Sequence, residues 1–176
     1  MELLEAITLR KSTRSYKEEQ IGDEALATVL NAGCAAPVGM GAYDSVHLTV
    51  IQNADLLDKI TIAAAKAFNN PKAKPFYGAP TVIIVSSTEN KKAASVEAAN
   101  AACIIENMSL AATDLGLGSV YLMGFLVAFS ADNELLKELN LPEGFRPVSA
   151  IALGYPTEPL NNSKGTKHTI SINTIK

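Results

Sequence analysis

The chain is poor in cysteine, with only Cys34 and Cys103 among its 176 residues. Two thiols cannot build a disulfide framework, and neither lies at the spacing of a metal ligand. Both fall in apolar, helix-like patterns, so we expect them to be small residues of the core. Such sparing use of cysteine favours a reducing, cytoplasmic location.

The chain also has no long apolar run and no excess of positive charge. No stretch reaches the roughly 18 apolar residues of a membrane span, and the opening MELLEAITLRK lacks the order of a signal peptide. The net charge of −3 argues against a general nucleic-acid-binding face. We therefore expect a cytoplasmic protein that binds neither membranes nor nucleic acids.

Groups suited to acid–base or hydrolytic chemistry are scarce. The two histidines, His47 and His168, lie in strand-like stretches, and a half-buried strand position is the simpler interpretation of His47. The G-x-S-x-G elbow, the P-loop and the G-x-G-x-x-G fingerprint are absent, and the acidic residues form no metal or glycosidase pattern. This inventory favours a cofactor that brings its own chemistry.

The chain does have enough apolar residues, 48%, to bury a core, and we expect one mixed α/β domain over residues 1–176. Residues 81–86 form a β-branched run after a proline, which is typical of a central strand buried on both faces. The periodicities predict helices over 2–9, from a cap at Asp23, over 55–68, over 91–115 and from a cap at Ser130, with further strands at 47–52, 119–122 and 148–154. The helix over 91–115 is apolar on more than one side, so we expect it to be the buried spine of the core.

The C-terminal 20 residues are polar as far as His168 and then alternate between polar and apolar side chains. Alternation over 169–172 predicts a peripheral strand, which we expect to pair with a partner's sheet. We accordingly expect residues from about 157 to 176 to form an extension that packs on a partner subunit.

Residues 10–14, Arg-Lys-Ser-Thr-Arg, place three cations and two hydroxyls just after the first helix. A phosphate needs charge neutralisation and several donors, and the planar guanidinium matches its oxygens. In an extended stretch alternate residues point the same way, so Arg10, Ser12 and Arg14 can converge on one anion. Taken alone, the same five residues also suit a solvated polar loop.

Five segments in order resemble the nitroreductase-like family of FMN-dependent oxidoreductases, and together they span about residues 3–160. The first, RKSTRSY at 10–16, is similar to the family's R-x-S-x-R-x-[FY] opening. The others are AAP at 35–37, FYGAPTVIIV at 76–85, the helix from Asn100 that ends in GLGSV at 116–120, and LPEGFRPV at 141–148 with ALGYP at 152–156.

The resemblance implies an α+β fold in which helices surround a central mixed sheet, and an intertwined homodimer with FMN where the subunits meet. It implies that Arg10, Ser12 and Arg14 hold the phosphate, with Lys11 contributing mainly backbone and Lys167 a loosely aligned late cation. The residues that it places beside the ring are Pro37, Val38 and Gly39 from the partner, Asn69 or Asn70 at the pyrimidine edge, and Tyr121, Leu122, Met123 and Gly124 along the isoalloxazine.

The implied activity is ping-pong electron transfer from NAD(P)H to a small electron-poor acceptor, such as a nitroaromatic, a quinone or an enone. One segment departs from the family, because its P-S-x-x-N-x-Q-P-W reads PVGMGAYDS at 37–45 and so lacks the hydroxyl, the amide and the tryptophan. This departure leaves two alternatives open: a non-catalytic flavin-binding or redox-sensing homodimer, and an anion-binding interaction module that uses the basic segment alone.

Overall fold

The computed structural model describes residues 1–90, 95–160 and 170–175. Four strands form one sheet in the order β1-β2-β4-β3, with β1 at Val46–Ile51, β2 at Thr81–Thr88, β3 at Gly118–Leu122 and β4 at Phe145–Gly154. All three strand pairs are antiparallel, so the mixed sheet that we expected is wrong for these strands. Parallel pairing among the described residues is limited to an isolated bridge between Ser12 and Ser119.

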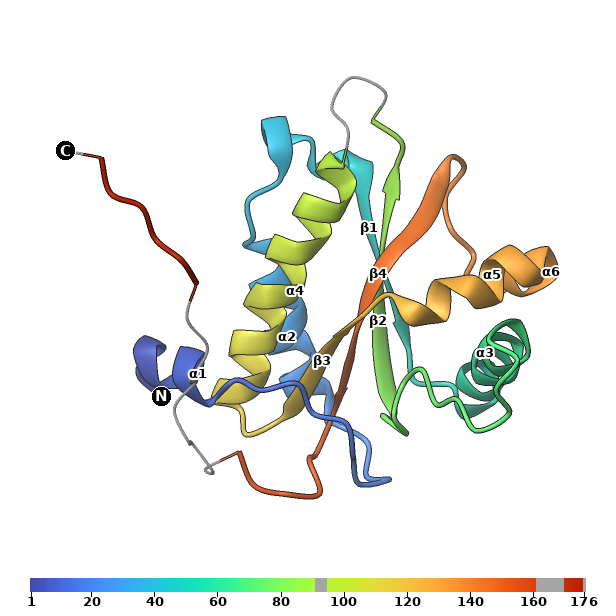
Figure 1. Ribbon diagram of the computed structural model, residues 1–176, viewed down its shortest axis with the longest axis horizontal. Coiled ribbons are helices and arrows are strands. Elements are labelled where there is room, and N and C mark those ends of the chain that lie inside the picture. The colour runs from blue at the N-terminus through green and yellow to red at the C-terminus, as the bar shows by residue number, and fades with distance from the viewer. Residues whose placement is uncertain (91–94, 161–169, 176) are drawn as a thin grey trace.

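Helices cover both faces of this sheet (Figure 1). One layer holds α2 (Asp23–Cys34) and α4 (Val96–Asp114), with α1 (Leu3–Leu9) packed on α4. The other layer holds α3 (Ala54–Ala67), α5 (Val127–Ala131) and α6 (Asn133–Lys137). Short 3-10 turns complete the list: η1 at Gly39–Gly41, η2 at Tyr43–Ser45 and η3 at Gly124–Leu126.

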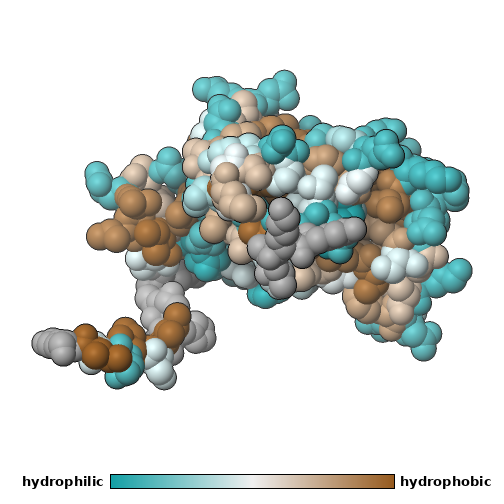
Figure 2. Space-filling model, turned by 90° about the horizontal axis from the view of Figure 1, so that it is seen from above, coloured by the Kyte–Doolittle hydropathy of each residue, from teal (hydrophilic) through white to brown (hydrophobic). Residues whose placement is uncertain are grey.

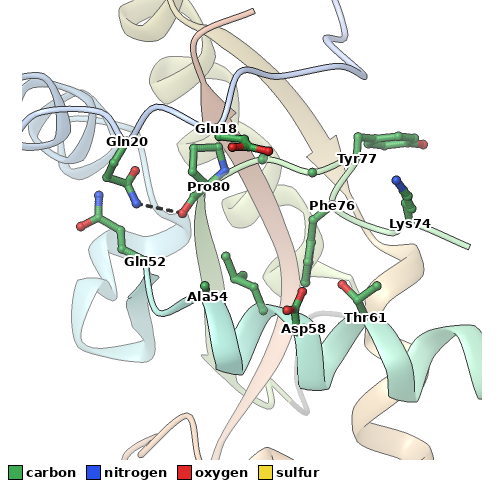
Figure 3. Close-up of a pocket in the computed structure, with 13 residues that line it drawn as sticks. Glu18, Gln20, Gln52, Ala54, Asp58, Thr61, Lys74, Phe76, Tyr77 and Pro80 are labelled. Atoms are coloured by element: carbon green, nitrogen blue, oxygen red, sulfur yellow. Dashed lines mark hydrogen bonds between the residues drawn. The ribbon is translucent and has the colours of Figure 1, made fainter.

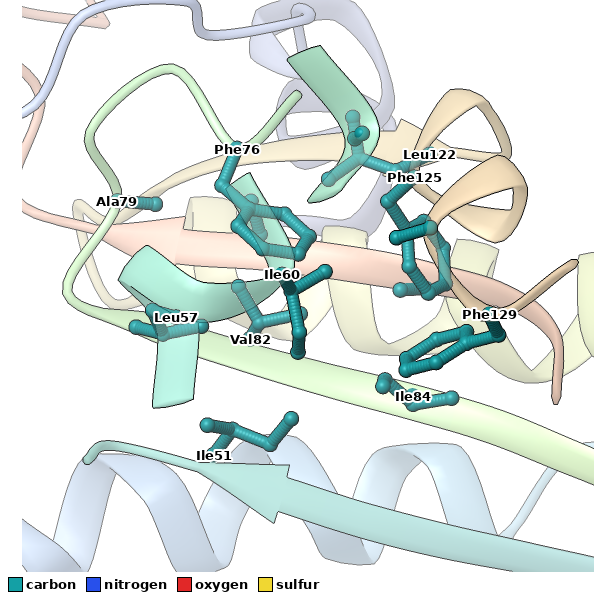
Figure 4. Close-up of a cluster of buried hydrophobic side chains, with 14 of the residues drawn as sticks. Ile51, Leu57, Ile60, Phe76, Ala79, Val82, Ile84, Leu122, Phe125 and Phe129 are labelled. Atoms are coloured by element: carbon teal, nitrogen blue, oxygen red, sulfur yellow. The ribbon is translucent and has the colours of Figure 1, made fainter. Parts of the chain in front are cut away.

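The central strand β2 explains why the apolar run at 81–86 is continuous. Its side chains alternate between two buried clusters, with Val82 and Ile84 facing the α3 layer and Ile83 and Val85 facing α4. Residues Thr81 to Ser87 are all buried, as the sequence predicted. Figure 4 shows the first cluster, where Val82 lies with Ile60 of α3, and Ile84 lies with the ring of Phe129. A strand covered on both faces needs no polar alternation.

The helices depart from the sequence predictions mainly at their ends. Gly22, and not Asp23, is the N-cap of α2, and no side chain caps that helix. The cap expected at Ser130 is wrong, because Ser130 lies inside α5, which begins at Val127. The leucine-containing helix is α6, and Asp132 caps it because its carboxylate accepts from the N–H groups of Glu134 and Leu135. The long helix begins at Val96, and residues 91–94 lie outside the described residues.

The expectation of buried cysteines was wrong, since Cys34 and Cys103 are both exposed free thiols. Cys103 shares its side of α4 with exposed Ala99 and Ala102, whereas Ile104, Ile105 and Met108 form the buried side. The spine is therefore only partly covered, because this side of α4 stays exposed at Ala99, Ala102 and Cys103 in the described part of the chain. Residues 170–175 are in neither helix nor strand in the single chain, so the strand that we expect to pair with a partner's sheet stays a prediction, and residues 161–169, including Thr169, lie outside the described residues.

Candidate functional site: the outer edge of β3

The basic segment runs along the outer edge of the sheet, beside β3. Ser12 bridges Ser119, and the N–H of Thr13 donates to the Ser119 carbonyl at 2.9 Å. Thr13 is buried against Gly118, where a Cβ would meet the threonine Cγ2 and Oγ1 at 2.7 Å. The predicted alternation is confirmed at these positions, because Thr13 points inward while Ser12 and Arg14 remain exposed.

Tyr16 connects the basic segment to strand β4 through its buried hydroxyl group. Its hydroxyl donates to the Thr13 carbonyl at 2.9 Å and lies 3.5 Å from the Ala152 carbonyl of β4. Burial raises the pKa of Tyr16, so the phenol stays protonated and keeps its role as a donor. The basic segment is thus held by backbone bonds to β3 and by one buried phenol.

Each of the two arginines has a partner of its own. The Nε of Arg10 lies 3.4 Å from Oε1 of Glu106 on α4. The guanidinium of Arg14 lies 5.8 Å from the ring centroid of Tyr77, and its Nη1 is 3.4 Å from the Ser12 carbonyl. The two guanidinium groups therefore have different partners in this structure, Glu106 for Arg10 and Tyr77 for Arg14.

A cavity of about 360 Å³ opens beside the same segment. Its walls are residues 11–15 on one side and residues 156–158, just after β4, on the other. The half-buried Lys11 contributes its side chain as well, since its Nζ donates to the Pro159 carbonyl at 3.4 Å. Glu158 is the one acid in this wall, so the lining carries a net positive charge.

The far end of β3 brings a second group of the expected residues together. Leu122 points into the core, whereas Tyr121 and Met123 are exposed. Gly124 lies beside the end of α3, because a Cβ placed there would be 3.6 Å from Cζ of Phe68. Asn69, which follows Phe68 with a left-handed φ of 50°, therefore lies at this same end of the site.

The loop with Pro37, Val38 and Gly39 does not join the edge of β3. Val38 is buried in the α2/α4 layer, and the N–H of Gly39 donates to Oδ1 of Asn100 on α4 at 2.9 Å. Figure 1 shows this blue-to-cyan loop at the top of the molecule and the basic segment at the bottom. Within a single chain, residues 37–39 therefore lie apart from the other expected site residues. Lys167 lies outside the described residues.

A second cavity, of about 430 Å³, has Tyr77 among its lining residues (Figure 3). Its wall is held by a chain of hydrogen bonds in which the Thr81 hydroxyl donates to Gln20 and accepts from Gln52 at 3.1 Å. Gln20 also donates to the Pro80 carbonyl at 3.0 Å. Tyr77 links this cavity to the basic segment through its contact with Arg14.

Sequence reasoning missed Tyr77 and Glu106 as neighbours of the arginines. Tyr77 is 63 residues from Arg14 in the sequence (77 − 14), and Glu106 is 96 residues from Arg10 (106 − 10). No local sequence pattern connects residues so far apart. Elsewhere in the described part of the chain, no three His, Cys, Asp or Glu residues are grouped as they would be around a metal ion. None of the described helices is both long and apolar enough to span a membrane.

Comparison with known proteins identifies the family of this chain. The nitroreductase family model matches residues 7–155. A protein of Archaeoglobus fulgidus, provisionally named NADH dehydrogenase/NAD(P)H nitroreductase, is 30% identical over 157 residues, which are 89% of this chain and 87% of that protein.

Among solved structures, a nitroreductase with bound FMN from Bacteroides fragilis is 32% identical, with a TM-score of 0.78 over 100% of this chain and 98% of that one. A nitroreductase with bound FMN from Desulfitobacterium hafniense has the same fold, with a TM-score of 0.84 at 24% identity and 100% coverage of both chains. The match over most of the chain, together with these relatives, establishes that this chain belongs to the nitroreductase family.

Proposed function

We propose that the chain is an FMN-dependent oxidoreductase that moves electrons from NAD(P)H to a small electron-poor acceptor, such as a nitroaromatic, a quinone or an enone. The observation that carries this proposal is the edge of β3. Cations and hydroxyls lie at one end of the edge, and at the other end Tyr121 and Met123 lead to Gly124, which lies beside Phe68 at the end of α3. Family membership and the FMN bound in the Bacteroides fragilis relative support it.

The residues at the basic end fit a flavin phosphate. Three cations within five residues outnumber the acids beside them, which are Glu106 and Glu158. Arg10, Ser12 and Arg14 would neutralise and orient the phosphate, because charged donors form the strongest hydrogen bonds to its oxygens. Lys11 would help from the wall of the cavity beside them.

When bound, FMN would supply the hydride-accepting and hydride-donating chemistry. The protein would contribute position and donors: backbone N–H groups at 121–124 along the ring, and Asn69 at its pyrimidine edge. Few side chains need act as acids or bases, which agrees with the small inventory in the sequence. NAD(P)H and the acceptor would occupy the same site in turn, which is a ping-pong scheme.

We further propose that the working unit is a homodimer, in which Pro37, Val38 and Gly39 complete the partner's site. Apolar side chains of α1, among them Leu4, are exposed in the single chain (Figure 2). Residues 170–175 stand away from the body and expose Ile170, Ile172 and Ile175. We propose that this extension packs on the partner, that Lys167 reaches its phosphate, and that the protein works in the cytoplasm.

The test is steady-state oxidation of NADH and NADPH by the FMN-loaded protein, with a quinone and a nitroaromatic as acceptors. Turnover with a ping-pong pattern is expected. FMN binding without turnover would instead favour a flavin-binding or redox-sensing dimer, which the loss of the hydroxyl and amide at 37–45 supports. A colourless protein that takes up no FMN would instead favour the remaining alternative, an anion-binding interaction module.

A further inference from the structure

The loop at residues 37–41 is tied to α4 by one buried side chain. Asn100 is only 7% exposed, and its Oδ1 accepts the N–H of Gly39 at 2.9 Å. Loss of this donor would cost a buried amide oxygen its hydrogen bond, so the bond favours this position of the loop.

The space around Gly39 admits no side chain. A Cβ at that position would lie 2.9 Å from Cγ2 of Val96 and 3.4 Å from Oδ1 of Asn100. The glycine therefore allows its backbone to approach α4 closely enough for the hydrogen bond. Val38 anchors the other side of the turn, being buried in the α2/α4 layer and accepting the N–H of Gly41 at 2.9 Å.

The residue that follows the anchored glycine is strained and unpacked. Met40 has φ 59° and ψ 12°, the left-handed region that costs a non-glycine residue free energy, and its side chain is 81% exposed. Among the residues that the structure describes, little packs against the Met40 side chain to compensate for that backbone. The conformation persists because Val38, Gly39 and Gly41 determine it from both sides.

From these contacts we infer that Asn100 is a positioning residue for flavin binding: by holding Gly39, it sets where residues 37–41 stand against the partner subunit's flavin. The inference rests on the proposed function and goes beyond it, because it assigns a role to a residue that lies inside its own subunit. The loop has no hydroxyl or amide side chain between Pro37 and Gly41, so its backbone and apolar atoms make the contacts. Such contacts depend on position to a fraction of an ångström.

Two variants disturb the same contact from opposite sides. Asn100→Ala removes the acceptor, and Gly39→Ala places a Cβ against Val96 and Asn100. Asn107→Ala is the matched control, because Asn107 lies two turns along α4 and its Nδ2 donates to the Ala32 carbonyl of α2 at 3.1 Å. That bond also joins an amide to a backbone group, but it leaves the loop untouched.

The experiment titrates each full-length variant with FMN and records the visible spectrum and midpoint potential of the bound flavin. We expect Asn100→Ala and Gly39→Ala to weaken FMN binding by about tenfold and to shift the spectrum and the potential in the same direction. Asn107→Ala should leave all three within error of the parent, even where it lowers stability.

Unchanged spectra, potentials and affinities in both loop variants would overturn the inference, as would a control that behaves like them. If Asn100→Ala does not fold, Gly39→Ala decides, because its site is a partly exposed loop. A parent protein that binds no FMN would refute the proposed function itself. A parent that binds FMN while the variants match it would refute only the role of Asn100.

Discussion

Arg10, at the C-terminal end of α1, and Glu106 of α4 form an ion pair, with Nε and Oε1 3.4 Å apart. The carboxylate is more than half exposed, so the pair is weak by itself. The pair matters because Arg10 is one of the residues proposed to hold the flavin phosphate. A phosphate bound to Arg10 would lie close to the negative charge of Glu106, and both anions would contact the same guanidinium group.

Replacement of this carboxylate should therefore strengthen FMN binding. We expect Glu106→Gln to lower the dissociation constant of FMN by up to about fivefold, which corresponds to the loss of one exposed like-charge interaction. Riboflavin, which has no phosphate, should bind both proteins equally. The measurement is a pair of fluorescence titrations, one with each flavin.

Glu134→Gln is the control, because Glu134 also forms an exposed ion pair, at 2.6 Å with Lys137, but on α6. Weaker FMN binding by Glu106→Gln would contradict the account and would mean that Glu106 orients Arg10 for the phosphate.

Gly118→Ala should impair both stability and FMN binding. The new methyl would overlap Thr13, which is buried between Ser12 and Arg14, so the basic segment would have to move away from β3. Overpacking of this kind costs about 1–3 kcal/mol. Urea unfolding gives the free energy, and an FMN titration gives the effect on the site.

Gly22→Ala serves as the comparison, since no atom lies within 4 Å of a Cβ at that position. Equal unfolding midpoints for Gly118→Ala and the parent would show that Thr13 does not depend on this close approach.

The exposed apolar side of α1 should carry the dimer. Leu4 is 76% exposed there, and a charge at this position would have to be buried when two copies meet. Leu4→Glu should yield monomers by light scattering at concentrations where the parent is dimeric, and should weaken FMN binding because the partner's loop is lost. Ile62→Glu, at a site 69% exposed on α3 in the opposite layer, should remain dimeric.

Glu97 should make the protein sensitive to acid. The backbone N–H of Asn90 donates to its carboxylate at 2.5 Å and lowers the pKa of Glu97 below its ordinary value of 4.5. A lowered folded-state pKa contributes stability that is fully present above the ordinary, unfolded-state pKa of Glu97, and the contribution is lost as the pH falls through the folded-state pKa. Glu97→Gln should therefore reduce the difference in unfolding free energy between pH 7 and pH 3.

Urea unfolding at several pH values tests this dependence, with Glu134→Gln as the exposed control. The same slope of stability against pH in Glu97→Gln and the parent would exclude a contribution from this carboxylate.

The regular elements were predictable from the sequence because burial imposes a period on them. The strand at 81–86 and the helix at 55–68 both lie within two residues of their observed bounds. Each is defined by side chains that meet a continuous apolar layer. The ends were less predictable, as at Asp132, because several polar residues near a boundary can accept from the first free N–H groups.

The exposure of Cys103 was not predictable from the chain alone. An apolar side of a helix looks the same in sequence whether its neighbour is in the same chain or in another copy. The partners of the arginines were also beyond local patterns, because Glu106 and Tyr77 reach them only through folding. The same holds for Asn100, whose contact with Gly39 joins residues 61 positions apart.

The most direct test measures FMN binding by the parent and by an Arg10→Ala, Arg14→Ala double variant. The parent should be yellow and bind FMN. The double variant should lose nearly all of that affinity, because each charged contact to the phosphate contributes roughly 1.5–3 kcal/mol. A double variant that binds FMN as tightly as the parent would contradict the phosphate site at the edge of β3.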